Sequence, residues 1–301
     1  LDASRAAAVC SKLLDASGAE AYLAAVNVEH ERLRERFLTK SQTPLLSLAE
    51  ARSKHWAWVV PNGGLPKPQR LSEIQVRDPL PLEELVPLID WTPFFTVWQM
   101  RGVYPRILER AEAKTLFDEA VQLLDNLVKQ KTLVARAVFG AFPAHSEGDD
   151  ILVAGSRWPM LRQQAERSQG KPARSLADFL ASEGDSLGLF AVSAGFGCDE
   201  AVKVYEADHD DYHAIMVRAL ADRLAEAGAE WVHRELRIAW GLETRESFSP
   251  EELIKEQYSG IRPAPGYPAC PDHVTKQDLF RILDVEDKVG MKLLDSGAMW
   301  P

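Results

Sequence analysis

The 301-residue chain is 46% hydrophobic and 27% charged, values typical of a soluble globular protein of one large or two ordinary domains. Its formal net charge of −10 argues against nucleic acid as the main partner, because phosphate binding needs clustered Lys and Arg. No apolar run approaches the roughly 18 residues of a membrane span, the N-terminus is no signal peptide, and three scattered cysteines indicate the reducing cytoplasm.

The first half of the chain predicts helices interrupted by short strands. Residues 4–38 predict one long helix with interleaved charges, followed by a linker rich in Pro, Gly and basic residues. Alternation over residues 71–79 predicts a strand. The segment PLEELVPLIDWTPFFTVW (81–98) predicts a short helix that leads into an aromatic turn, and apolar periodicity predicts a helix over 106–131.

The second half predicts the main sheet and the longest helix. Two strands flank a turn within 132–155, residues 157–168 predict a helix, and SLGLFAVSAGFG (186–197) predicts a buried strand. Residues 199–240 predict the longest helical stretch, with a break near HDDY. Ser249 and Glu252 form a capping box for a helix at 249–258. Strands and long helices without regular βαβ alternation predict an α+β fold.

The segment GIRPAPGYPACPDH (260–273) is too rich in proline for a helix or a central strand. Arg262 offers a planar fork of donors to a carboxylate or phosphate. The prolines restrict the unfolded chain, and Ala264 and Gly266 allow a ligand to approach the backbone. We expect either a binding ribbon or a structural strap tied down by one salt bridge.

Three carboxylates are further candidates. Asp90 lies among bulky aromatic residues, which predicts partial burial and suits an amine ligand, although an N-cap explains it equally well. Together with Arg262 it would complement an amino-acid zwitterion. Asp222 and Glu226 share a helix face with His233, which indicates either a solvated acidic stripe or the wall of a cleft.

The motif HDDYH places His209 and His213 four residues apart, a spacing that allows two metal ligands on one helix face. No recognised spacing supplies a third ligand, and acidic residues are ordinary at a helix N-terminus. The motif nevertheless defines a hydrolase hypothesis that predicts stoichiometric zinc. GxGxxG, P-loop, GxSxG and paired CxxC motifs do not occur, which disfavours Rossmann enzymes and NTPases.

Three long segments carry a family resemblance: residues 88–108, residues 208–233 and the ribbon 260–273. In this order and spacing they resemble the reactivation domain of cobalamin-dependent methionine synthase, which binds S-adenosylmethionine. The resemblance covers nearly the whole chain. It implies a C-shaped α+β fold with long helices around a central antiparallel sheet. It also implies that residues 1–40 are the tail of the cobalamin-binding domain with a linker helix, and that 41–301 form the S-adenosylmethionine-binding domain.

The resemblance assigns roles to individual residues. Arg262 would hold the carboxylate of S-adenosylmethionine, and Asp90 would contact its amino group. Ala264, Gly266 and Tyr267 would line the groove, with Glu226 nearby. Asp222 lies where the family's cobalamin domain docks. The resemblance implies no catalytic residue and no metal, because the domain only positions the methyl group over cobalamin held by the neighbouring domain.

The implied function is repair within a methyltransferase of methionine biosynthesis from homocysteine. A flavodoxin-type donor supplies an electron, and S-adenosylmethionine supplies the methyl that remethylates cob(II)alamin. The chain alone is not sufficient for methionine synthesis, because it lacks homocysteine, folate and complete cobalamin modules. We expect neither nucleic acid nor membrane as a partner.

The resemblance also has a departure at the C-terminus. The family continues past Trp300 and Pro301 into a GWYF-like segment whose tyrosine contacts the ligand, so we expect a C-terminally truncated domain with an incomplete site. The alternative function is therefore a docking module for a cobalamin domain that no longer uses S-adenosylmethionine.

Overall fold

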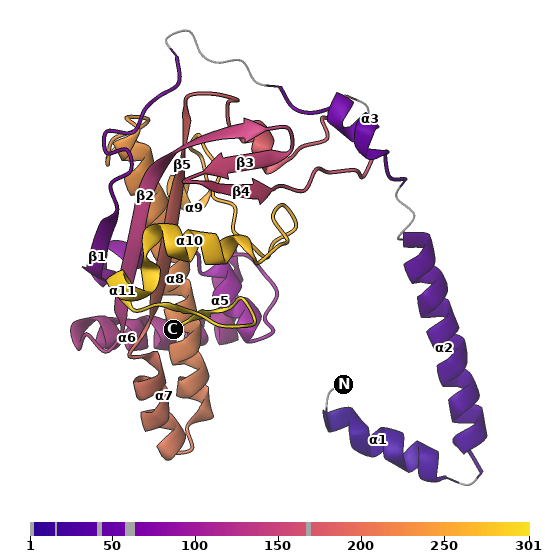
Figure 1. The fold of residues 1–301 in the computed structure, drawn as a ribbon. Helices are drawn as coiled ribbons and strands as arrows, with labels where there is room; N and C mark the ends of the chain where they lie inside the picture. Colours follow the sequence, from indigo (N-terminus) through magenta and orange to yellow (C-terminus); the bar gives the residue numbers. More distant parts are fainter. Residues whose placement is uncertain (1–2, 16, 41–43, 58–63, 167–169) are drawn as a thin grey trace. The chain divides into compact units, whose positions relative to one another are not determined.

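The computed structural model describes residues 3–15, 17–40, 44–57, 64–166 and 170–301. The chain divides into two compact units. The first comprises residues 1–55 and 162–173, and the second comprises residues 56–161 and 174–301 (Figure 1). The boundary expected after residue 40 falls at residues 41–43, which lie outside the described residues.

The first unit contains three helices: α1 (Ala3–Leu14), α2 (Ala19–Lys40) and α3 (Leu48–Ser53). The single helix expected over 4–38 was wrong, because a turn separates α1 from α2. The side chain of Asp15 accepts hydrogen bonds from the backbone N–H and hydroxyl of Ser17, at 3.0 and 2.7 Å. This local bonding competes with helix continuation. α3 begins with a capping box between Ser47 and Glu50.

The second unit is built on a five-stranded antiparallel sheet. Its strands are β1 (Gln75–Leu80), β2 (Val134–Glu147), β3 (Asp150–Val153), β4 (Ser156–Pro159) and β5 (Asp185–Phe196). The order is β1-β2-β3-β4, with β5 also paired to β2. The longest register runs from Val134↔Phe196 to Ala144↔Asp185. β2 is therefore the strand that ties the sheet together. A two-stranded sheet of β6 (Lys292–Leu293) and β7 (Met299–Trp300) lies near the C-terminus.

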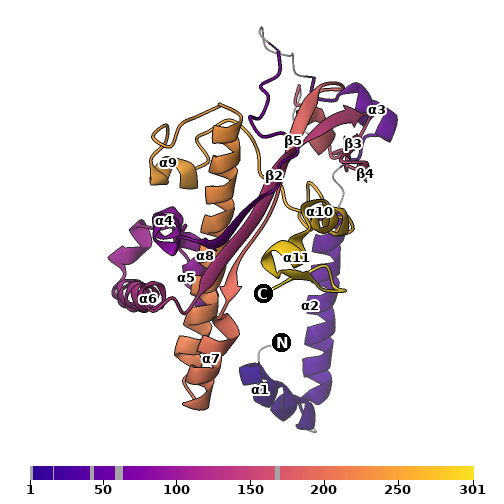
Figure 2. The same cartoon turned by 60° about the vertical axis from the view of Figure 1, so that its left-hand side comes forward.

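Helices cover both faces of this sheet (Figure 2). On one face α8 (Asp211–Ala239) packs against β5 and β2. The helices on that side are α4 (Leu82–Leu85), α5 (Thr92–Val97), α6 (Ala111–Lys129), α7 (Cys198–Ala207) and α9 (Pro250–Ile254). The short η1 (Val86–Leu88) packs on α8, and η2 (Arg106–Glu109) packs on α6. On the other face α10 (Thr275–Leu283) and α11 (Val285–Val289) pack against β5 and β2. A short η3 (Leu176–Phe179) precedes β5.

Alternation along β2 creates two hydrophobic cores. Ala137 and Phe139 join the core on the α8 side, whereas Val138 and Phe142 join the core that contains α10 and α11. Successive strand side chains point to opposite faces, so a strand covered on both faces carries apolar side chains toward each of them. The expected α+β fold with helices around a central antiparallel sheet is confirmed.

Two local predictions were wrong. The aromatic turn expected at the end of the segment 81–98 is mostly α5, because Pro93 sits in the first turn of a helix, where its missing N–H costs nothing. The helix expected over 157–168 is absent from the described residues of that range: residues 157–159 belong to β4, whose Trp158 pairs with Ile151 of β3 and is buried against the sheet, and residues 160–166 are not helical. Within the described residues, no helix is both long and apolar enough to cross a membrane.

Candidate functional site

The central helix α8 carries a polar stripe. Asp222, Glu226, Glu230, His233 and Arg237 recur at spacings of three or four residues and therefore share one side of the helix. The helix begins where the Asp210 side chain accepts a hydrogen bond from the N–H of His213, at 3.0 Å. The first two stripe residues are exposed, whereas the last three are buried. The stripe thus leads from solvent into the protein.

Arg262, in the ribbon 260–273, contacts the buried part of this stripe. Its Nη1 donates to Oε2 of Glu230 at 2.7 Å and to the hydroxyl of Tyr258 at 3.0 Å, and lies 3.4 Å from Nδ1 of His233. Its Nη2 has a 4.0 Å approach to the exposed Glu256. Because the side chain of Arg262 is 19% exposed, part of the guanidinium remains open to solvent.

The contact with Glu230 belongs to a buried charge network. Arg237, 3% exposed, donates from Nε and Nη2 to Glu243, at 2.7 and 3.1 Å, and from Nη2 to Glu230 at 3.4 Å. Its guanidinium also lies 3.6 Å from the centre of the Tyr258 ring. Removing one member of such a network leaves an uncompensated buried charge, so the network fixes its members in place.

His233 is neutral within this network. Burial, together with Arg237 and Arg262, lowers the pKa of His233 to about 3. A neutral imidazole can accept a hydrogen bond at the Nδ1 that faces Arg262, provided Nε2 carries the proton. Burial and the hydrogen bond to Glu230 raise the pKa of Tyr258 to about 12. At neutral pH the imidazole of His233 therefore stays uncharged, and the hydroxyl of Tyr258 keeps its proton.

The ribbon beyond Arg262 is held in a tight turn. The N–H of Gly266 donates to the carbonyl of Cys270 at 2.7 Å, and the N–H of Cys270 donates to the carbonyl of Tyr267 at 2.9 Å. Gly266 has φ +99°, and a Cβ there would lie 2.4 Å from Cε1 of His273. Only glycine fits this position. Ala264 and Tyr267 are exposed, so the turn presents backbone and an aromatic ring to solvent.

Asp90 is exposed, so the expected partial burial was wrong. The neighbouring rings of Trp91, Phe94 and Phe95 point into the core and leave the carboxylate outside. Asp90 Oδ1 accepts from the N–H of Thr92 at 2.9 Å, a local Asx turn, and it is not the N-cap of α5, which is Trp91. In the described residues no hydrogen bond or ion pair joins Asp90 to Arg262.

The elements that flank Asp90 in the chain pack on α8. It lies between η1 and α5, and both elements pack on that helix. Trp231 of α8 donates to Glu84 of α4 at 2.8 Å, and the Trp98 ring after α5 lies 4.9 Å from that of Tyr212. The elements on either side of Asp90 therefore pack on the helix that carries Glu226.

The HDDYH motif does not place two histidines on one helix face. His209 precedes α8 with φ +57°, and Nδ1 of His213 lies 2.6 Å from Oδ2 of Asp210. Among the described residues, no three His, Cys, Asp or Glu side chains gather as metal ligands would.

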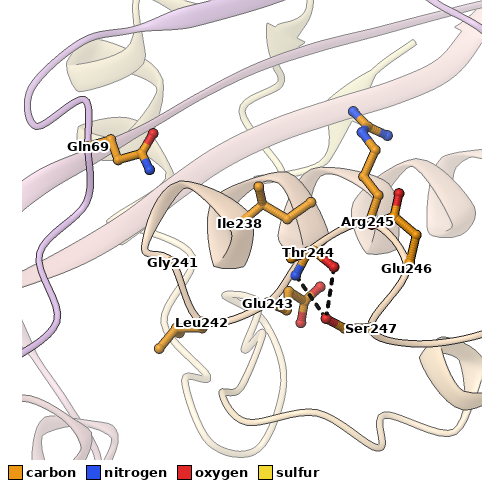
Figure 3. A pocket seen from close by; sticks show the side chains of 9 residues that line it. All are labelled: Gln69, Ile238, Gly241, Leu242, Glu243, Thr244, Arg245, Glu246 and Ser247. Carbon is orange, nitrogen blue, oxygen red and sulfur yellow. Dashed lines mark hydrogen bonds between the residues drawn. The ribbon is translucent and has the colours of Figure 1, made fainter.

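Two surface cavities are lined by residues other than those expected to bind the ligand. One, of about 640 Å³, follows the C-terminal end of α8 and is lined by Gln69, Ile238 and residues 241–247 (Figure 3). The other, of about 570 Å³, follows α5 and is lined by Thr96 and residues 99–102. The face with Glu226 and the ribbon is therefore not part of either cavity.

Arg262 was predicted from the sequence, but its partners Glu230 and Tyr258 were missed, as was Arg237, which binds the same Glu230. The helical spacing of Glu226, Glu230 and Arg237 could have indicated that these three residues share one face of the helix. Which of these side chains meets the ribbon depends on how residues 249–262 return to α8, and no local pattern encodes that contact.

The geometry defines a class of protein: an α+β domain without a Rossmann sheet, in which a proline-rich ribbon presents a guanidinium beside an acidic helix. The comparisons give the family. Residues 81–301 match the model of the activation domain of vitamin B12 dependent methionine synthase. A crystal structure of the MetH reactivation domain bound to AdoHcy is 45% identical, with 86% of this chain and 84% of that chain covered and a TM-score of 0.78.

This chain therefore belongs to the activation-domain family of vitamin B12 dependent methionine synthase. The resemblance inferred from the three sequence segments is confirmed. The chain is the reactivation module of a methyltransferase, the vitamin B12 dependent methionine synthase.

Proposed function

We propose that the second unit binds S-adenosylmethionine along α8 and the ribbon 260–273. Arg262 holds the ligand carboxylate and Asp90 contacts its amino group. Ala264, Gly266 and Tyr267 line the groove, and Glu226 lies beside it. The related domain was crystallised with AdoHcy, the demethylated form of this ligand, which supports the choice.

The observation that carries the proposal is the anchored guanidinium of Arg262. One nitrogen is held by Glu230 and Tyr258 while the side chain stays partly exposed, so further donors can meet a carboxylate. The exposed Ala264 leaves the backbone of the ribbon open to a ligand, while glycine at position 266 lets His273 pack against the turn and hold its shape. The residues present therefore fit an amino-acid ligand.

The bound ligand would supply a sulfonium methyl group for reductive remethylation of cobalamin. The residues of this chain bind and orient the ligand, a contribution that lowers the barrier by approximation and needs no general base. Cobalamin itself belongs to the neighbouring domain.

The partners in this proposal are the cobalamin-binding domain of the same parent chain and a flavodoxin-type electron donor. Asp222, with a side chain 66% exposed at the outer end of the α8 stripe, contacts the cobalamin domain. Residues 1–40 form the tail of that domain and a linker helix. The three cysteines are free thiols, which supports a reducing cytoplasm as the compartment.

Complementation of a separate cobalamin domain tests this function. With a reduced flavodoxin as electron donor, we expect remethylation of cobalamin, followed by its absorption spectrum, only when both this chain and S-adenosylmethionine are present. Association of the two proteins without any dependence on S-adenosylmethionine would instead support a docking module.

A further inference from the structure

We infer that Glu230 is a positioning residue that orients the Arg262 guanidinium toward the carboxylate of the ligand. The inference rests on the proposed function and extends it from the residues that touch the ligand to the carboxylate behind them.

Glu230 is placed to hold a guanidinium. It is 4% exposed, and its Oε2 accepts from Nη1 of Arg262 at 2.7 Å and from the hydroxyl of Tyr258 at 2.8 Å. Its Oε1 accepts from Nη2 of Arg237 at 3.4 Å. Both carboxylate oxygens are thus engaged, and the contact with Arg262 is the shortest of the three.

The support behind Glu230 is rigid. Arg237 is bound through two nitrogens to Glu243, and it packs over the Tyr258 ring. Rotation of Glu230 away from this position would remove the closest counter-charge of the half-buried Arg262 and leave the buried Arg237 with Glu243 alone, which is unfavourable. Glu230 therefore stays in place when a ligand binds.

A second possibility is that Glu230 competes with the ligand by occupying Arg262. A competitor would take the guanidinium fork with both oxygens, as a free carboxylate does. Here Glu230 touches one nitrogen of Arg262 only, and its other oxygen faces Arg237. The contact fixes the angle of the guanidinium plane, and its other edge, which the exposed Glu256 approaches only to 4.0 Å, remains for the ligand. The two possibilities predict opposite effects of removing the charge.

Binding affinities of two ligands, measured by calorimetry, distinguish positioning of Arg262 by Glu230 from competition. S-adenosylmethionine carries the carboxylate, and decarboxylated S-adenosylmethionine lacks only that group. For Glu230→Gln we expect roughly tenfold weaker binding of the first ligand, the loss of about one charge-assisted hydrogen bond, and unchanged binding of the second. Tyr258→Phe should show the same selectivity with a smaller loss. Glu119→Gln and Tyr212→Phe, which alter a tyrosine–glutamate pair on the surface, should change neither affinity.

The outcomes separate this inference from the proposed function. Tighter binding of S-adenosylmethionine by Glu230→Gln would show competition, and equal losses for both ligands would show a merely structural role; either overturns the inference. Equal affinity of the unaltered protein for both ligands would overturn the proposed role of Arg262 itself. If Glu230→Gln unfolds, as a melting curve would reveal, Tyr258→Phe decides by the same criteria.

Discussion

Nη1 of Arg262 lies 2.7 Å from Oε2 of Glu230, so the ribbon 260–273 is fastened to the central helix α8 at the residue expected to bind the ligand. An arginine on a free loop would lose side-chain entropy on binding, whereas this one is already ordered. We therefore expect the affinity for S-adenosylmethionine to depend on the geometry of the ribbon as well as on its residue types.

Gly266→Ala tests the geometry of the ribbon. The added Cβ meets His273 at 2.4 Å in a backbone with φ +99°, so the turn must shift. We expect S-adenosylmethionine to bind at least roughly tenfold more weakly in calorimetry, since about 1.4 kcal/mol of strain corresponds to that factor. Gly184→Ala is the matched control, because it has φ +70° but no neighbour within 4 Å. Equal affinities of the two variants would contradict a role for this turn.

His233 predicts a pH dependence of stability. Its pKa is about 3 in the folded protein and returns toward 6.5 on unfolding. Between these values the unfolded chain binds more protons, so the free energy of unfolding falls as pH falls below 6.5, by up to about 1.4 kcal/mol per pH unit. Urea unfolding between pH 7 and pH 5 should show a shallower loss for His233→Gln than for the unaltered protein. Parallel curves would mean that His233 takes up a proton in the folded state.

Asp222 and Glu226 are neighbours on the exposed part of the α8 stripe but have different proposed roles. Asp222→Asn should weaken association with a separate cobalamin domain and leave S-adenosylmethionine affinity unchanged. Glu226→Gln should weaken the affinity for the ligand, because the carboxylate lies beside the groove that receives a cationic sulfonium. Surface plasmon resonance against the cobalamin domain and calorimetry with the ligand distinguish the two. A loss of S-adenosylmethionine affinity in Asp222→Asn would show that Asp222 also takes part in ligand binding, which contradicts the separate roles.

The aromatic core beneath Asp90 sets the stability of this side of the unit. Phe94 is fully buried in α5, whereas Val97 in the same helix is 51% exposed. Phe94→Ala should lower the free energy of unfolding by about 3–5 kcal/mol through lost burial and a cavity. Val97→Ala should change it by about 0.5 kcal/mol or less. Denaturant unfolding measures both, and a small effect of Phe94→Ala would show that the core collapses around the vacancy.

Much of the fold could be predicted because local patterns matched their tertiary surroundings. The Ser249–Glu252 capping box and the helix break before Asp211 depend on neighbouring residues only, and the structure contains both. The strand around Trp158 was missed because its short polar sequence resembles a helix, and pairing with β3 decides its conformation.

In the candidate site, too, some features could be predicted from the sequence and others could not. Proline content alone excluded helix from the ribbon 260–273, which contains none. The burial of Asp90 was predicted wrongly, because bulky neighbours can all turn inward and leave the residue between them exposed. Glu230 was missed because its partner Arg262 is 32 residues away in the chain and only tertiary folding joins them.

The binding of S-adenosylmethionine by this chain, measured by calorimetry for the unaltered protein and for Arg262→Ala, tests the central claim most directly. Arg157→Ala, which removes an arginine paired with Glu147 and Asp150 on the sheet, is the control. We predict saturable binding that Arg262→Ala weakens by roughly a hundredfold, the value of a buried charge-assisted contact, and that Arg157→Ala leaves unchanged. Absence of binding by the unaltered protein, or equal binding by Arg262→Ala, would contradict the account.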